Sequence, residues 1–198
     1  MKKKTSIKIG FILLMLSIGL LSCDDNYQPK PRGYFRIALP AQEYTLFTHP
    51  SYPFSFMMST NAIITKPRIN PERYWINITY PKFNAKIHIS YKHIDHNLDV
   101  LLNDMHKMMT RHIPKANAIN EQVYLNQDEQ VYGMAYDIQG SEAASPYQFY
   151  LTDSTTNFVR GALYFEFTPN NDSLKPIINF LEKDMRELIN SFRWENKQ

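Results

Sequence analysis

The sequence predicts a single α+β domain, with an antiparallel β-sheet and two amphipathic helices packed on one face, preceded by a signal peptide and a short tether. Three observations support this prediction. Several short segments alternate apolar and polar residues, which indicates strands with one face in water. Two longer segments repeat apolar residues at helical spacing. The chain has 198 residues, of which 43% are hydrophobic, and this is enough for one domain with a substantial core.

The clearest strands form a predicted hairpin, Tyr74–Tyr80 with Ala85–Tyr91, joined by a turn at Pro81–Asn84. Apolar residues at alternate positions of both strands can meet on one face, and polar residues fall on the other. A second turn is expected at Asp153–Thr156, where short polar residues cluster. The remaining alternating segments predict further strands at Phe35–Leu39, Phe54–Met58, Val131–Ile138, Tyr147–Thr152 and Phe158–Phe167.

Two segments predict amphipathic helices. The first spans Leu98–Met109 and ends before Pro114. The second spans Leu174–Phe192 and carries the longest apolar stripe in the chain, with Pro176 in the first turn, where a missing N–H is tolerated. Each stripe must be buried, and we expect both to cover the same face of the sheet, because this is the simplest arrangement.

The N-terminus has the form of a secretory signal peptide. Four lysines lie in the first eight residues, and an apolar run follows from Ile9 to Leu21. As a helix this run would be about 20 Å long. A bilayer core is about 30 Å thick, so the run is too short to remain as a membrane span.

The run ends in Leu20–Cys23, which resembles a lipobox, the signal for attaching acyl chains to a cysteine and cleaving just before it. Cys23 is the only cysteine in the chain. An ordinary signal peptide with an incidental cysteine is the alternative. We predict a signal peptide at residues 1–22, a lipidated tether at 23–33 and an α+β domain at 34–198.

The predicted location follows from the lipidated cysteine. Acyl chains on Cys23 would hold the protein in the cell envelope without spanning the membrane, and the domain would face the periplasm. The acidic residues at Asp24–Asn26 do not decide between the inner and the outer membrane.

The charge of the mature chain argues against nucleic acid as a partner. The full chain has a net charge of +3, but four of its 22 basic residues and none of its 19 acidic residues precede Cys23. Cleavage therefore leaves 18 basic and 19 acidic side chains, a net charge of −1. Such a chain has no overall basic field to attract polyanions.

The sequence predicts no catalytic residue, metal site or small-molecule cofactor, and therefore no enzyme. His88, His93 and His96 lie close together but match no strong metal-ligand spacing, and we interpret them as solvated histidines. His106 and His112 are interpreted as structural. The chain contains neither a nucleotide-binding glycine motif nor a G-x-S-x-G nucleophile elbow.

One segment is a candidate for recognition. Ile138–Tyr147 is a loop of small residues between two strands rich in aromatic residues. Loops held on a rigid sheet often bind partners. We predict that this loop contributes to a partner-binding surface through Gln139, Gly140, Ser141, Glu142, Pro146 and Tyr147.

Several stretches together resemble one family, the gliding motility lipoprotein GldD family of Bacteroidota. They follow one another along nearly the whole mature chain, at Pro29–Tyr34, Trp75–Lys92, Val131–Thr155, Arg160–Phe165 and Pro169–Trp194. The resemblance implies a non-enzymatic accessory lipoprotein needed for gliding motility and type IX protein secretion. It also implies protein partners from that machinery, and it assigns a functional role only to Cys23.

The residues leave two alternatives open. The chain could be an envelope lipoprotein enzyme such as a hydrolase, which a deep pocket with converging His, Asp or Glu side chains would favour. It could also be a small-ligand carrier, which an apolar cavity between the sheet and the helices would favour.

Overall fold

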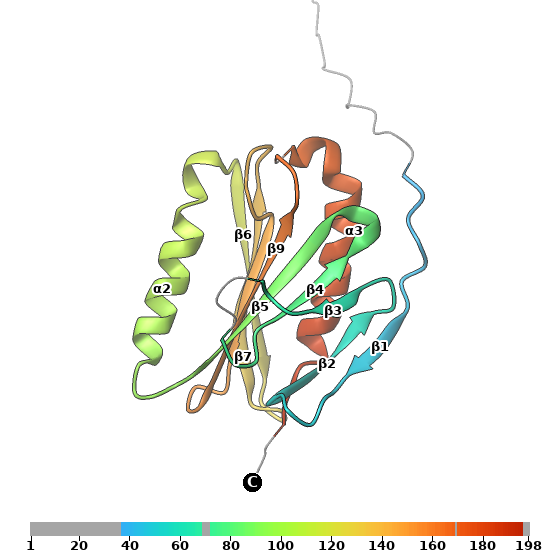
Figure 1. Ribbon diagram of the computed structural model, residues 1–198. Coiled ribbons are helices and arrows are strands. Elements are labelled where there is room, and N and C mark those ends of the chain that lie inside the picture. Colours follow the sequence, from blue (N-terminus) through green and yellow to red (C-terminus); the bar gives the residue numbers. More distant parts are fainter. Residues whose placement is uncertain (1–36, 69–71, 169, 196–198) are drawn as a thin grey trace, which may run out of the picture. The chain divides into compact units, whose positions relative to one another are not determined.

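An antiparallel seven-stranded sheet is the main element of the computed structural model, which describes residues 37–68, 72–168 and 170–195 (Figure 1). The described residues belong to one structural unit, Phe35–Gln198. The order across the sheet is β3 (Ile63–Thr65), β4 (Ile76–Tyr80), β5 (Ala85–His93), β9 (Asn157–Phe165), β8 (Tyr147–Thr152), β7 (Val131–Gln139) and β6 (Ala118–Asn126).

A smaller three-stranded sheet and two α-helices complete this unit. The small sheet has the order β1 (Tyr44–Phe47), β2 (Phe54–Ser59), β10 (Arg193–Trp194). The helices are α2 (Leu98–Thr110) and α3 (Asn171–Asn190), and short 3₁₀ turns, η1 and η2, lie at Pro81–Phe83 and Ile113–Lys115. Neither helix is both long and apolar enough to cross a bilayer.

The larger core lies between the main sheet, the small sheet and α3. Alternate residues of β4 and β5, such as Ile78 and Ile87, are paired across the strands and are about 1% exposed. They belong to one buried cluster with Leu181 and Met185 of α3 and with the stacked rings of Phe54 and Phe192. We call this side of the main sheet the α3 face.

The opposite side of the sheet, the α2 face, has a second and smaller core. Met105 and Met109 of α2 pack there with Tyr136, Ile138 and Phe158 of the strands. Figure 1 shows α2 and α3 on either side of the sheet. The antiparallel α+β architecture is confirmed, but the prediction that both helices cover one face is wrong. Strands β7 and β9 carry apolar residues on both faces, so both faces need a cover.

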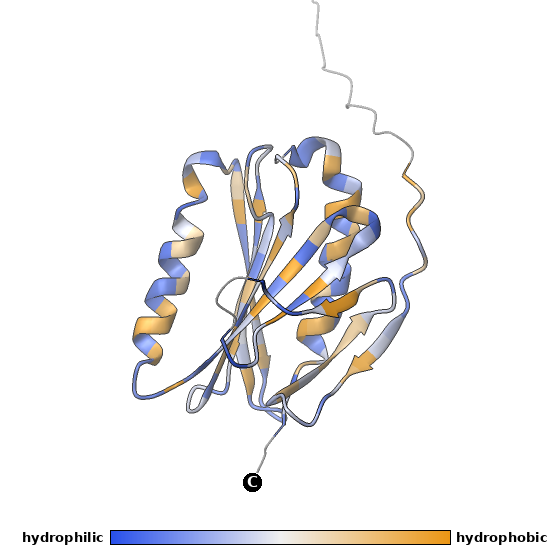
Figure 2. Ribbon diagram, viewed as in Figure 1, coloured by the Kyte–Doolittle hydropathy of each residue, from blue (hydrophilic) through white to orange (hydrophobic). Residues whose placement is uncertain are grey.

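The predicted hairpin is confirmed, although β4 begins at Ile76 and not at Tyr74, and β5 continues to His93. Ile76 pairs with Ile89, and Tyr80 pairs with Ala85. The turn between them is η1, and it ends at Asn84, whose φ of 47° lies in the left-handed region that Asn tolerates. Figure 2 shows the resulting alternation of hydrophilic and hydrophobic residues along β5.

Other predicted bounds differ from the structure. The described part of the segment Phe35–Leu39 is not a strand, and β1, β3, β6 and β10 were not predicted. The edge strand β6 is mostly exposed on both faces, so it has no apolar alternation to detect.

The helix α3 begins earlier than predicted, at Asn171, which leaves Pro176 inside the helix and beyond its first turn. The buried Asn171 side chain explains the early start. Its Nδ2 donates hydrogen bonds to the carbonyl oxygens of Gly140, at 2.8 Å, and Ala143, at 2.9 Å. These bonds attach the first turn of the helix to the loop after β7.

A buried carboxyl group connects α3 with the chain segment that leads into the small sheet. Asp184 is 2% exposed. Its Oδ1 accepts hydrogen bonds from the Tyr44 hydroxyl at 3.0 Å and from the Gln42 amide at 3.1 Å. Burial raises the pKa of Asp184, although the hydrogen bonds oppose this effect, and burial beside the carboxyl raises the pKa of Tyr44 to about 12.

We predict that Asp184→Asn removes a pH dependence of folding stability. The pKa of Asp184 is higher in the folded than in the unfolded chain, so its contribution to stability falls as the pH rises from about 4 through the folded pKa. Asn keeps the acceptor oxygen but does not ionise. Urea unfolding at about pH 4 and about pH 7 should show a gain for the variant relative to wild type at the higher pH.

Two comparisons make this test specific. Asp184→Ala leaves the Tyr44 and Gln42 donors without their acceptor and should lower the free energy of unfolding by about 2 kcal/mol. Asp128→Asn removes an exposed acid from the turn after β6 and serves as the matched control. An Asp184→Asn profile parallel to wild type would contradict the assignment.

Candidate functional site

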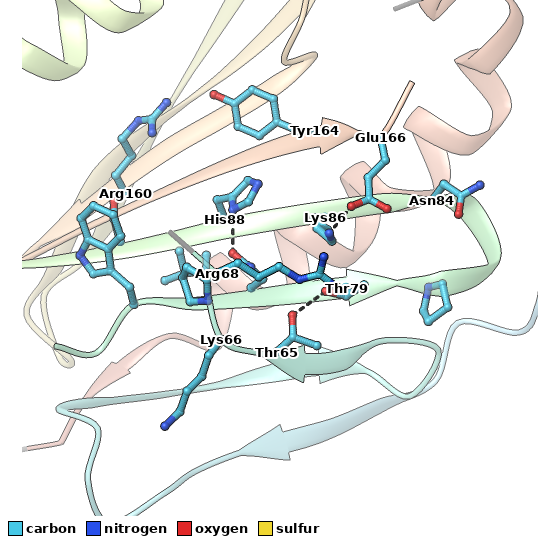
Figure 3. A pocket seen from close by; sticks show the side chains of 16 residues that line it. Thr65, Lys66, Arg68, Thr79, Asn84, Lys86, His88, Arg160, Tyr164 and Glu166 are labelled. Carbon is cyan, nitrogen blue, oxygen red and sulfur yellow. Dashed lines mark hydrogen bonds and ion pairs between the residues drawn. The ribbon is translucent and has the colours of Figure 1, made fainter. Parts of the chain in front are cut away.

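Two hollows adjoin each other on the part of the α2 face that the helix leaves open. One has a volume of about 840 Å³ and lies over β3, β4, β5 and β9 (Figure 3). The other, of about 790 Å³, lies between the end of α2, η2, the loop after β7 and β9. Arg160 and Tyr164 line both hollows. We name the combined feature the cationic groove, and its charged side chains are Lys66, Arg68, Lys86, Arg111, Lys115, Glu142, Arg160 and Glu166.

The strand register explains why polar side chains gather on the groove floor. Lys86 of β5 pairs with Tyr164 of β9, and Ser90 pairs with Arg160. Successive residues of a strand point to opposite faces. The register that buries Ile87 on the α3 face therefore places Lys86 and its alternate neighbours in the groove.

Six of the eight charged groups are cationic. Two of the cations have an acidic neighbour: Lys86 forms an ion pair with Glu166, and the Lys115 Nζ lies 3.6 Å from the Glu142 Oε2. Lys86 holds the pKa of the exposed Glu166 below its usual range. In Figure 3 the Lys66 side chain points away from the groove floor, whereas Arg68 extends along it.

Arg160 occupies the junction of the two hollows and is held by a buried amide. Its Nη2 donates to the Gln148 Oε1 at 3.0 Å, and the Gln148 Nε2 lies 2.8 Å from the His112 Nε2. Gln148 is fully buried. Because the amide nitrogen donates, His112 Nε2 accepts and the ring is neutral. The Nε of Arg160 is buried and has no hydrogen-bond partner among the described residues.

Two histidines of the groove have pKa values below the usual range. For His112 the causes are burial and the nearby Arg160 charge. For His88 they are burial, then Lys86 and Arg160, partly opposed by Glu166. The His88 Nδ1 lies 2.6 Å from the Asn77 Oδ1, and an amide oxygen only accepts, so Nδ1 carries the proton. Burial is the larger cause for both rings, and the nearby cations add to it.

The six residues of the predicted recognition loop differ in exposure and contacts. Gln139 and Glu142 are exposed, and Glu142 lines the second hollow of the groove. The backbone carbonyls of Gly140 and Ser141 bind Asn171, and a Cβ at Gly140 would lie 2.2 Å from the Lys115 carbonyl oxygen.

Pro146 and Tyr147, the other two residues of that prediction, are buried. The Pro146 carbonyl accepts a hydrogen bond from the Ile138 amide at 2.8 Å. Partner binding by this loop therefore stays a prediction for its exposed residues.

The remaining predictions have different outcomes. His112, interpreted as structural, lines the groove, and His88 lies on its floor. His93 and His96 border a separate shallow hollow. No group of three His, Cys, Asp or Glu residues in the described part of the chain could hold a metal ion. Cys23 and the ranges 1–22 and 23–33 lie outside the described residues.

Sequence reasoning missed the groove because its members are far apart in the chain. His112 and Gln148 are separated by 36 residues, and Lys86 and Glu166 by 80. The available signal was a set of cations at alternate strand positions, such as Lys86 on β5 and Arg160 on β9.

We predict that Arg160→Met raises the pKa of His112 and of His88. The substitution removes a positive charge that disfavours protonation of both rings. The change can be followed by NMR titration of the two imidazoles. Lys183→Met removes an exposed cation from α3, on the other side of the sheet, and should leave both pKa values where they were. Equal shifts in both variants would refute the electrostatic explanation.

A family model described as gliding motility lipoprotein GldD matches residues 24–194 of the chain. Among solved structures, the chain is similar to the solution structure of cyanobacterial PsbP (CyanoP) from Synechocystis. That similarity has a TM-score of 0.48 and 8% sequence identity, and it covers 81% of this chain and 97% of the other. No curated protein matches the sequence.

Proposed function

Because the chain belongs to the gliding motility lipoprotein GldD family, we propose that it is an accessory protein of both gliding motility and type IX protein secretion. It acts by binding other proteins and not by catalysis. The observation that carries the proposal is the extent of the family match, which begins at residue 24, directly after Cys23, and continues to residue 194.

The proposed mechanism is positional. Each buried CH₂ of an acyl chain contributes about 0.8 kcal/mol, so two or three chains on Cys23 make release from the membrane negligible. The tether at residues 23–33 can span at most about 40 Å when extended. The domain would therefore stay close to the periplasmic surface of its membrane and meet its partners there.

The contacts of the groove support binding as its role. One ring nitrogen of His88 and one of His112 are each within hydrogen-bond distance of a side-chain amide, from Asn77 and Gln148. These amides fix the orientation of the rings and occupy one nitrogen of each, which favours a binding surface over a catalytic site. The groove is lined by cations that could attract a partner, while the apolar residues of the sheet are buried beneath α2 and α3.

We predict that deleting the gene reduces colony spreading and the export of surface adhesins by type IX secretion. Complementation with the wild-type gene should restore both. Spreading assays and proteomics of the culture supernatant measure the two effects separately. Normal secretion and spreading in a clean deletion strain would overturn the proposed function.

Cys23→Ala should show whether function requires the lipid anchor, because it removes the acylation site and leaves the domain unchanged. Without its thiol the chain cannot be acylated, so the protein should move from the membrane to the soluble fraction and fail to complement the deletion. Ser22→Ala keeps a small residue before the cysteine and serves as the matched control. Mass spectrometry of the N-terminal peptide identifies the acyl chains. A wild-type protein with a bare Cys23 would contradict lipid anchoring.

Crosslinking in intact membranes would separate the alternatives. Capture of proteins of the secretion or gliding machinery is the expected result. Turnover of envelope material by the purified protein would favour a hydrolase, and a co-purifying small molecule would favour a carrier.

A further inference from the structure

We propose that the cationic groove binds an extended acidic segment of a protein partner. This inference rests on the proposed function, because it assumes a protein ligand, and it adds the binding site and the chemistry of the segment. The starting point is the unequal distribution of charge. The mature chain has a net charge of −1, yet the groove is lined by two acids and six cations, of which Lys66 points away from the floor.

Concentrating like charges in one hollow is unfavourable unless something offsets their repulsion. The two acids of the groove offset only part of it, because Glu166 pairs with Lys86 and Glu142 lies beside Lys115. The field of such charges is focused in a concave site, where it attracts ligands of the opposite sign. The groove is therefore complementary to an anionic ligand.

Arg160 is the fixed cation of the site. The buried Gln148 holds one end of its guanidinium, and Gln148 in turn contacts His112. A side chain that is already held in place loses little conformational entropy on binding. Guanidinium groups also form paired hydrogen bonds with carboxylates. Figure 3 shows Arg160 beside Tyr164 at one end of the first hollow, with Lys86 and Arg68 further along.

The spread of the cations favours an elongated ligand over a small anion. They extend from Arg68, which follows β3, to Lys115 in η2, and they occupy two hollows joined at Arg160. A single phosphate or carboxylate would contact only a few of them. In an extended peptide, side chains on the same side recur about every 7 Å. Acidic residues at alternate positions could therefore meet successive cations of the groove.

The concave form of the groove disfavours a flat anionic membrane surface. Lys86 and Arg160 project from strands on the floor of the hollows, and residues at the end of α2 and at Lys66–Arg68 line their edges. A narrow chain can enter such a hollow, whereas a bilayer surface would contact its rim first.

The test uses the purified mature lipoprotein in a neutral detergent and a fluorescent oligoglutamate peptide. Anisotropy is measured at about 10 mM salt, where charges act over about 30 Å. We expect saturable binding that weakens as salt is added. An oligoglutamine peptide of the same length should not bind. Absence of saturable oligoglutamate binding would overturn the proposal.

Charge variants assign the binding to the groove. The double variant Arg160→Gln and Lys86→Gln should bind about tenfold more weakly. The matched control, Lys175→Gln with Lys183→Gln, removes the same charge from exposed positions on α3 and should bind like wild type. Glu166→Gln should have the opposite effect and bind about threefold more tightly, because it removes an acid from the groove. Equal weakening in the control variant would overturn the assignment.

A second measurement detects the ligand at the site in the wild-type protein. It therefore does not depend on a variant that could misfold. A bound carboxylate near Arg160 and Lys86 should raise the NMR-measured pKa values of His112 and His88, because it offsets the charge of Arg160 beside both rings and of Lys86 beside His88. Tighter binding of phosphatidylglycerol vesicles or heparin than of oligoglutamate, lost in the same double variant, would show that the ligand class is wrong.

The outcomes distinguish this inference from the proposed function. If the deletion strain loses secretion and spreading but the Arg160→Gln, Lys86→Gln variant complements it fully, the accessory role stands and the groove proposal fails. If the deletion strain is normal while purified protein binds oligoglutamate through the groove, the accessory role fails and the binding chemistry stands.

Discussion

The pairing of β5 with β9 fixes which side chains are buried and which line the groove. It runs without a break from Ala85 opposite Phe165 to His93 opposite Asn157. A shift of one residue in either strand would invert its faces. Ile87 or Leu163 would then leave the α3-side core, and a neighbour such as Lys86 or Tyr164 would enter it. The apolar core therefore determines the register, and the register determines the position of the groove cations.

Ionisable groups differ in burial between the two faces of the sheet. On the α3 face, Asp184 is almost fully buried and depends on donors from Tyr44 and Gln42. Buried charges are costly unless they are paired or hydrogen-bonded. On the α2 face the groove cations remain partly in water, so several can lie close together at a smaller cost. Asp184 consequently serves the fold, whereas the groove cations are available to a ligand.

The elements that sequence analysis predicted well are those with a repeating pattern. The strand Tyr147–Thr152 agrees with β8 residue for residue, and the helix Leu98–Met109 differs from α2 by one residue. The pattern of a single segment cannot report on its neighbours. Strands β7 and β9 bury residues on both faces, so their alternation did not reveal that α2 lies opposite α3. The edge strand β6 buries too little on either face to show any pattern.

The candidate site was less predictable than the fold, because it depends on contacts between distant segments. In the sequence, Gln148 is one residue of a predicted strand, and His112 follows a predicted helix. Only the docking of α2 against β8 and β9 brings them together beside Arg160. The predicted recognition loop lies next to this site, but its backbone is occupied in holding Asn171, and two of its six named side chains are buried.

Binding by the proposed groove would depend on the proposed membrane anchor. Partly exposed ion pairs contribute up to about 1 kcal/mol each and weaken with salt, so a groove of this kind binds modestly in free solution. Tethering changes this balance without any new contact. Confining a binding site to the membrane surface where its partner lies raises the effective concentration of the two. A membrane-anchored domain can therefore use weak, reversible electrostatic contacts where a freely diffusing one would remain largely unbound.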